Sequence, residues 1–261
     1  MILKMKLNSL KRTLFLLIWM VLPLLSFAGD QADVLFAAGN ASYAKGHYKE
    51  ALASYQKILD GAHQSAAVYF NMGNSSYKLA DIPSALLYYE KAHRLSPNDE
   101  DIKANIRLAN SKTSDKIEEV PEFFLNRWWN SFMLSFSVHT FSIWSIILVL
   151  LGSAFLILYF FAESFLVKKS SFFTAILFLF FGVLVLFISG RQVSYFKEHR
   201  QAIIFMSPVT VKSAPAEQSG SLFVIHEGMK VNVLGGDNGW FRIRLANGNQ
   251  GWVKQSELKE I

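Results

Sequence analysis

Two long apolar runs in the middle of the chain constrain its fold most. They cover residues 141–162 and 170–190, and neither contains Asp, Glu, Lys or Arg. A helix rises about 1.5 Å per residue, so each run is long enough to cross a hydrocarbon core of about 30 Å. Helices buried in a soluble core rarely reach this length without a charge. We therefore expect two transmembrane helices joined by a tight turn at residues 163–169.

The N-terminal segment has the pattern of a signal peptide. Four basic residues precede an apolar run at residues 14–25, which is followed by Ser26, Phe27 and Ala28. This order of charge, apolar stretch and small residues predicts cleavage after Ala28. An uncleaved anchor is the alternative interpretation. Either one sends the following segment across the membrane.

The basic residues near the helices give two conflicting predictions of orientation. The turn carries Lys168 and Lys169, whereas four cations lie on the other side of the two runs. This local count would place the turn outside. The first apolar segment usually dominates orientation, however, and four cations precede it. We therefore expect residues 29–140 and 191–261 to face outward and the turn to be cytoplasmic.

Charge and composition exclude several classes of chemistry. There is no cysteine, which rules out disulfides, thiol nucleophiles and iron–sulfur clusters. Of the net charge of +6, +4 lies within residues 1–28, so the remainder gives no support to nucleic acid as a partner. The six histidines are scattered, and no GxSxG or GxxxxGK motif is present. We expect no catalytic residue, no metal and no cofactor, and hence no enzyme.

An internal repeat of 34 residues precedes the apolar runs. Gly39 is followed at this spacing by Gly73, Ala51 by Ala85, and Tyr55 by Tyr89. A fixed period of this size indicates a solenoid of helical pairs. The periodicity predicts helices over 35–44, 48–59, 69–79 and 83–95. A capping helix is expected over 101–112, preceded by an acidic stretch that favours a helix start.

These residues resemble the tetratricopeptide repeat (TPR). The small residues fall where the two helices of such a repeat cross closely, and Pro97 falls at its terminal proline. His63 replaces that proline in the first repeat. The resemblance covers about residues 32–99 and implies protein interaction on a concave face. Transferred by position, that face carries Phe36, Asn40, Tyr43, Phe70, Asn74, Tyr77 and Lys78.

Two interpretations of this set remain open. The asparagines can hold the backbone of an extended peptide while the aromatic rings supply contact area. Alternatively, the asparagines are common repeat residues and the tyrosines pack internally.

An aromatic segment lies just before the first apolar run. Phe123, Phe124, Trp128, Trp129 and Phe132 recur there at mixed helical spacing. Aromatic side chains of this kind are suited to the headgroup level of a bilayer. We expect a helix lying in the outer interface, although packing against the two transmembrane helices is compatible with the same pattern.

The C-terminal 60 residues have β-rich runs separated by turn residues. Strands are predicted over 209–212, 230–234, 240–245 and 251–253, and Asn247-Gly248 is a strong hairpin signal. About five short strands indicate a small barrel. The order of glycines, Trp240, Gly251 and Trp252 resembles bacterial SH3-like (SH3b) domains. Some of these bind cell-wall peptides, so Trp240 and Trp252 are candidate surface residues as well as candidates for the core.

The whole order of modules resembles BatE-type proteins of the bacterial aerotolerance (Bat) system. The resemblance implies a bacterial inner-membrane scaffold with its TPR and SH3-like domains in the periplasm. It also implies partners: other Bat membrane proteins with von Willebrand A (VWA) domains, and indirectly a MoxR-type AAA+ ATPase. A sensor that binds peptidoglycan through the barrel is the alternative function. Membrane lipid is expected around the hairpin.

The expected fold is thus a multidomain membrane protein with an all-α TPR solenoid, a transmembrane α-hairpin and a small all-β SH3-like barrel. Its expected parts are a signal peptide at 1–28, the TPR domain at 29–113, a linker with the interfacial helix at 114–140, the transmembrane pair at 141–190, a linker at 191–201 and the barrel at 202–261.

Overall fold

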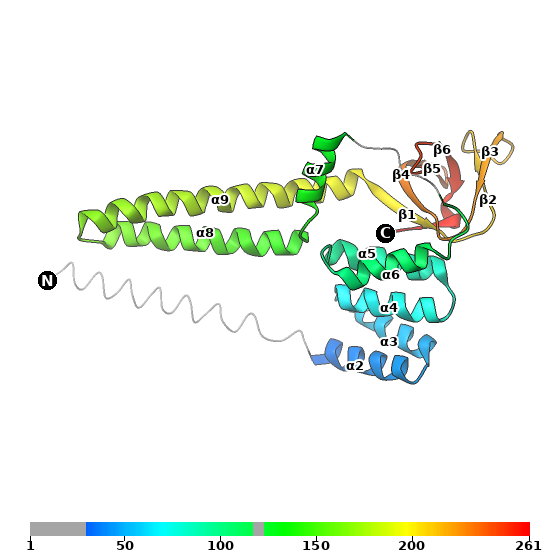
Figure 1. The fold of residues 1–261 in the computed structure, drawn as a ribbon, viewed down its shortest axis with the longest axis horizontal. Coiled ribbons are helices and arrows are strands. Elements are labelled where there is room, and N and C mark those ends of the chain that lie inside the picture. The colour runs from blue at the N-terminus through cyan, green and yellow to red at the C-terminus, as the bar shows by residue number, and fades with distance from the viewer. Residues whose placement is uncertain (1–29, 117–122) are drawn as a thin grey trace. The chain divides into compact units, whose positions relative to one another are not determined.

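The computed structural model describes residues 30–116 and 123–261 (Figure 1). It divides into two compact units, the first ending at His63 and the second beginning at Gln64. The predicted signal peptide lies outside the described residues, and so does the acidic part of the linker at 118–122.

The first unit contains a pair of helices, α2 (Asp30–Ala44) and α3 (Tyr48–Asp60). Gly46, with φ +80°, makes the turn between them in a backbone conformation that suits glycine. Gly39 lies against the buried ring of Tyr55, since a Cβ at Gly39 would be 2.4 Å from Tyr55 Cε1. The small residue therefore lets the two helices cross closely, as the repeat pattern predicts.

The second helical pair repeats this arrangement in the second unit. It consists of α4 (Ala66–Lys78) and α5 (Ile82–Leu95). A Cβ at Gly73 would lie 2.5 Å from the ring of Tyr89. Ser65 and Asp81 cap the two helices by accepting hydrogen bonds from backbone N–H groups in their first turns.

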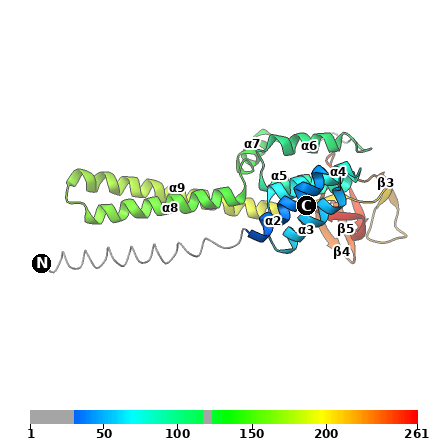
Figure 2. The ribbon, with the colours of Figure 1, turned by 90° about the horizontal axis from the view of Figure 1, so that it is seen from below.

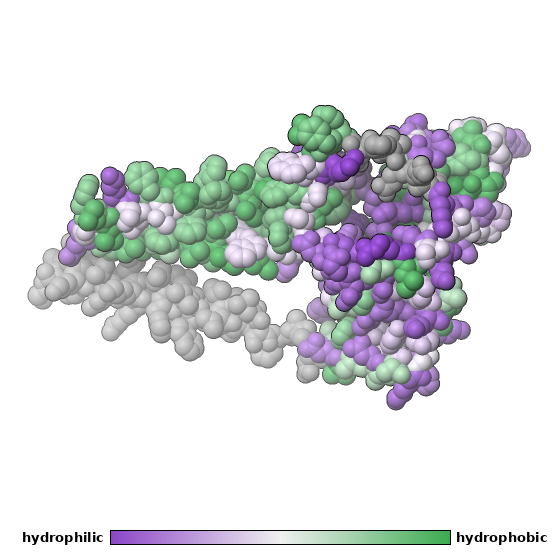
Figure 3. Space-filling view, viewed as in Figure 1, coloured by the Kyte–Doolittle hydropathy of each residue, from purple (hydrophilic) through white to green (hydrophobic). Residues whose placement is uncertain are grey.

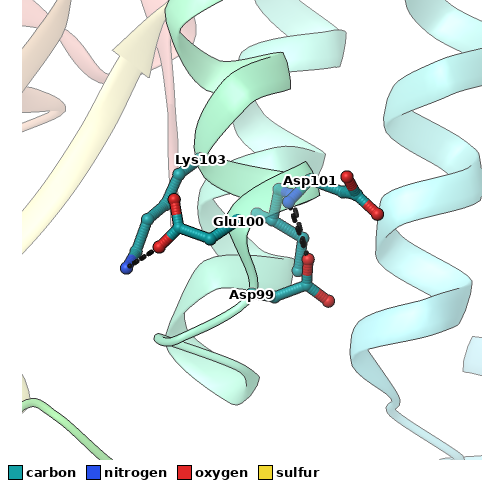
Figure 4. Close-up of polar contacts among 5 residues, drawn as sticks. Asp99, Glu100, Asp101 and Lys103 are labelled. Atoms are coloured by element: carbon teal, nitrogen blue, oxygen red, sulfur yellow. Dashed lines mark hydrogen bonds and ion pairs between the residues drawn. The ribbon is translucent and has the colours of Figure 1, made fainter.

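The predicted capping helix is present as α6 (Glu100–Asn110). Asp99 starts it, because its Oδ1 accepts hydrogen bonds from the backbone N–H of Asp101 at 3.0 Å and of Ile102 at 3.2 Å (Figure 4). Glu100 forms an ion pair with Lys103 at 3.0 Å. The acidic stretch therefore serves the helix start, as expected.

Two long apolar helices follow, α8 (Val138–Phe161) and α9 (Phe165–Glu198). They lie antiparallel and side by side (Figures 1 and 2). Close packing is possible because a Cβ at Gly182 would lie 2.8 Å from Val149 Cγ2, and Ser145 Oγ donates a hydrogen bond to the Gly182 carbonyl at 2.9 Å. Most of the large apolar side chains point outward, so the pair presents an apolar surface (Figure 3).

The helices extend beyond the apolar runs. The connection is shorter than the expected turn, because α9 begins at Phe165. Residues 191–201, expected to be a linker, are instead helical as far as Glu198 and enter a strand at Arg200. In this stretch Gln192 is fully buried, and its Nε2 donates a hydrogen bond to the Phe136 carbonyl at 2.8 Å, which ties this part of α9 to the segment before α8.

The aromatic segment forms helix α7 (Phe124–Met133), as predicted. Only Met133 of this helix is buried, and it joins a cluster with Phe141 and Ile188 at one end of the apolar pair. Most of its aromatic side chains are exposed. The helix therefore makes its packing contact at its C-terminal end and leaves an aromatic face uncovered.

The C-terminal domain is a single seven-stranded antiparallel sheet around an apolar core. Its strand order is β3-β2-β6-β5-β4-β1-β7. The four strands predicted by range are present, and the sequence did not place β1, β3 and β7. The strands are β1 (Arg200–Ile204), β2 (Val209–Lys212), β3 (Ser221–Ile225), β4 (Lys230–Asp237), β5 (Trp240–Arg244), β6 (Gln250–Lys254) and β7 (Leu258–Glu260).

Candidate functional site

The candidate peptide-binding residues of the second pair lie along α4, and their environments differ. Phe70 and Tyr77 are partly buried and pack against the core formed with α5 and α6. Asn74 Oδ1 accepts hydrogen bonds from the Tyr89 hydroxyl at 2.8 Å and from Asn105 Nδ2 at 2.9 Å. Lys78 is exposed. Of the four, Lys78 is the residue best placed to meet a partner.

The first pair repeats these contacts. Asn40 Oδ1 accepts a hydrogen bond from the Tyr55 hydroxyl at 2.7 Å. The Phe36 ring lies 5.9 Å from that of Tyr55, and the Tyr43 ring lies 5.3 Å from that of Tyr48. The equivalent asparagines thus bind the buried tyrosine of the partner helix in both pairs. Contact between this set and a peptide stays a prediction.

Trp240 and Trp252 lie on the adjacent strands β5 and β6. Trp252 is opposite Arg242 and Trp240 is opposite Lys254, so the two tryptophans share one face of the sheet. Both are half-buried. The opposite face of these strands carries Ile243, which is fully buried in the domain core. The two tryptophans therefore border the core without forming its centre.

A shallow pocket of about 560 Å³ adjoins Trp240. Lys254 lies over the indole ring, with Nζ 5.9 Å from its centroid, and forms an ion pair with Glu217. An aromatic ring beside a cation and a carboxylate can bind a polar ligand that also offers an apolar face. The geometry is that of a small surface site.

A contact that sequence reasoning missed joins the second pair to the barrel. Ile203 of β1 is 1% exposed and lies in one apolar core with Leu86 of α5 and Ala109 of α6. Phe205 and Ile261 pack against the same core. The second repeat, the capping helix and the barrel are therefore parts of one packed body.

Polar contacts surround this shared core. Lys230 Nζ of β4 forms an ion pair with Glu90 Oε1 of α5 at 2.8 Å, and the Glu90 side chain is 8% exposed. Asp115 accepts hydrogen bonds from the His226 backbone N–H at 2.6 Å and pairs with its Nδ1 at 2.8 Å. The partners are more than 100 residues apart in the chain. A residue-spacing pattern gives no signal for such pairs.

Burial shifts the pKa values of several titratable groups outside the two apolar helices. Burial lowers the pKa of His93 and raises the pKa of Tyr69. Within residues 30–116 and 123–261, no group of three or more His, Asp or Glu is arranged to hold a metal ion.

The geometry thus defines a chain with a TPR region, two long apolar helices and an SH3-like domain. Comparison with protein families supports both modules. The model of the tetratricopeptide repeat matches residues 66–99, which cover α4 and α5. The model of the bacterial SH3 domain matches residues 207–259, which cover β2 to β6 and the first two residues of β7.

Comparison with solved structures adds a similar SH3 domain. The C-terminal SH3 domain of myosin IB from Entamoeba histolytica is 26% identical, over 24% of this chain and 95% of that one, with a TM-score of 0.18. The SH3-like assignment of the C-terminal domain rests on the family match over residues 207–259 and on the strands there. The comparison with curated proteins finds no match.

Proposed function

We propose that this chain is a non-enzymatic membrane adaptor that holds its TPR and SH3-like modules on one side of a bilayer. One observation carries the proposal: α8 and α9 are antiparallel, so the second helical repeat before α8 and the barrel after α9 adjoin the same end of these two helices. The exposed apolar side chains along both helices are suited to lipid contact. The shared core of α5, α6 and β1 supports joint presentation of the two modules.

The finer assignment is to a BatE-type scaffold in a bacterial inner membrane, with both modules in the periplasm. The order of TPR region, aromatic helix, apolar pair and SH3-like domain supports it. Its partners would then be VWA-domain membrane proteins of the Bat type and, through them, a MoxR-type ATPase.

Affinity purification of the full chain from membranes tests this assignment. We expect VWA-domain membrane proteins to co-purify, and Lys78→Ala to reduce their recovery, because Lys78 is exposed at the C-terminal end of α4. Lys112→Ala, at an exposed lysine after α6, is the matched control. Equal recovery of partner proteins with Lys78→Ala and Lys112→Ala would contradict a binding role for the α4 face. If no envelope protein co-purifies with the wild-type chain, the scaffold function is contradicted.

A cell-wall sensor is the second candidate, favoured by the pocket beside Trp240. The full chain in detergent should then sediment with purified peptidoglycan, and Trp240→Ala should abolish this. Trp128→Ala, at an exposed tryptophan of α7, controls for loss of an aromatic ring. Absence of the wild-type chain from the pellet would exclude the sensor.

A further inference from the structure

A cavity of about 950 Å³ lies between the second helical pair and the start of α8. Its walls include Ser65 before α4, Lys91 and Arg94 on α5, and Ser137 and His139 at the start of α8. Among its described lining residues, none is Asp or Glu. The lining therefore includes basic and polar side chains, and its acidic group is the main-chain carboxylate of Ile261 beside Arg94.

The position of this cavity follows from contacts with α9. Only His199 separates α9 from β1, which packs on α5 through the shared core. The Arg94 guanidinium lies over the Phe196 ring of α9, 4.4 Å from its centroid. The hydroxyl oxygens of Ser142 in α8 and Ser189 in α9 are 3.2 Å apart. The end of α9 thus contacts both walls of the cavity.

The cations of the cavity repel one another. Burial lowers the pKa of Lys91, and the nearby Arg94 and Lys259 lower it further. Burial also lowers the pKa of Arg94, an effect that Glu90 partly offsets. Glu90 is itself paired with Lys230, and Arg94 donates a hydrogen bond to a main-chain carboxylate oxygen of Ile261, the last residue, so Arg94 already has an anionic partner whereas Lys91 has none among the described residues. A second anion, bound beside Lys91, would relieve the repulsion that Lys91 still experiences.

Two helix starts add to the same potential. Ser65 is the N-cap of α4 and Ser137 is the N-cap of α8, and both line the cavity. The first N–H groups of a helix carry a partial positive charge and can bind an anion. They therefore reinforce the basic side chains.

The level of the cavity along the apolar helices indicates the kind of anion. The charge-free apolar stretches begin near Phe141 in α8 and end near Gly190 in α9, whereas the cavity is lined by Ser137, His139 and Phe196 just outside them. If the pair spans a bilayer, as in the proposed function on which this step rests, the cavity is at headgroup level. We propose that it binds the headgroup phosphate of an anionic phospholipid, with the acyl chains lying along α8 and α9.

Lipid titration of the purified full chain in detergent, followed by native mass spectrometry, tests the proposal. Phosphatidylglycerol should bind at least about fivefold more tightly than phosphatidylcholine, whose choline cation is repelled by Lys91 and Arg94. Lys91→Gln should weaken phosphatidylglycerol about fivefold, because one basic residue contributes about that factor at an anionic lipid surface. Lys91→Arg should retain binding, and the exposed Lys112→Gln should leave it unchanged.

Two results would overturn the assignment. One is equal binding of phosphatidylglycerol to the wild type and Lys91→Gln. The other is that inorganic phosphate raises the unfolding temperature of the chain as much as phosphatidylglycerol does. The ligand of the cavity would then be a soluble anion. Alkaline extraction of membranes distinguishes failure of this proposal from failure of the proposed function. If the chain stays in the membrane pellet but binds lipids without selectivity, only the lipid site in the cavity is contradicted. If the chain appears in the supernatant, both the lipid site and the membrane adaptor are contradicted.

Discussion

Replacing Lys230 with Met tests how firmly the second repeat is joined to the barrel. Lys230 forms its ion pair with Glu90 at 2.8 Å, and the side chains are 42% and 8% exposed. Breaking a fully buried pair costs about 3–5 kcal/mol, because the remaining charge is left without compensation. Since Lys230 is partly hydrated, we discount this to about 2 kcal/mol.

The two partners should not be equivalent. Glu90→Gln leaves a lysine that reaches water and an amide that still accepts a hydrogen bond, so we expect a cost of about 1 kcal/mol. Lys230→Met leaves a carboxylate in the interface and should cost more. The double variant should cost less than the sum of the two single variants, because the second change removes the stranded charge.

Hydrogen exchange of the full chain in detergent measures these costs locally. A cost of about 2 kcal/mol accelerates exchange about 30-fold in the segments that open together, which here are α5 and β4. Lys103→Met is the matched control, since Lys103 pairs with the exposed Glu100 and should change exchange by about twofold at most. Equal effects of Lys230→Met and Lys103→Met, or a larger effect of Glu90→Gln, would refute the reasoning.

Two further changes probe the helical pair itself. Gly73→Ala should lower the free energy of unfolding by about 1–3 kcal/mol, because the new Cβ would lie 2.5 Å from the Tyr89 ring. Gly190→Ala in α9 is the control and should not lower it, since its Cβ would meet nothing within 4 Å. Thermal unfolding of the two variants measures the difference. Burial holds the pKa of folded His93 below its ordinary value of about 6.5, so the unfolded chain binds more protons and stability should fall as the pH drops below about 6.5. His93→Asn should flatten this dependence in chemical denaturation, and an unchanged slope would contradict the assignment.

Local patterns predicted the elements of this chain well. The 34-residue period places small residues opposite aromatic ones, and Gly39 and Gly73 do lie against Tyr55 and Tyr89. The β-turn dipeptide Asn247-Gly248 joins β5 and β6 as expected, with Gly248 at φ +90°. These features depend on neighbours within about one repeat or one hairpin, which sequence spacing records.

Contacts between distant segments could not be predicted in this way. Strand β1 directly follows α9 without a turn signal, so residues 191–201 had the pattern of a linker. Its pairing with β4 and β7, and its packing on α5, depend on residues far away in the chain. Asn74 illustrates the same limit for the site, because its type is compatible with peptide binding, whereas its bonds to Tyr89 and Asn105 follow from the fold.

Cysteine labelling tests the central claim, that both modules lie on one side of a membrane. The chain has no cysteine, so single substitutions report one position each. Ser114→Cys after α6, Gln218→Cys in the barrel and Glu163→Cys between α8 and α9 are all at exposed positions. With a maleimide that cannot cross the inner membrane, intact cells should label the first two, and Glu163→Cys should react only after the cells are broken. Labelling of Glu163→Cys in intact cells, or opposite behaviour of Ser114→Cys and Gln218→Cys, would contradict the account.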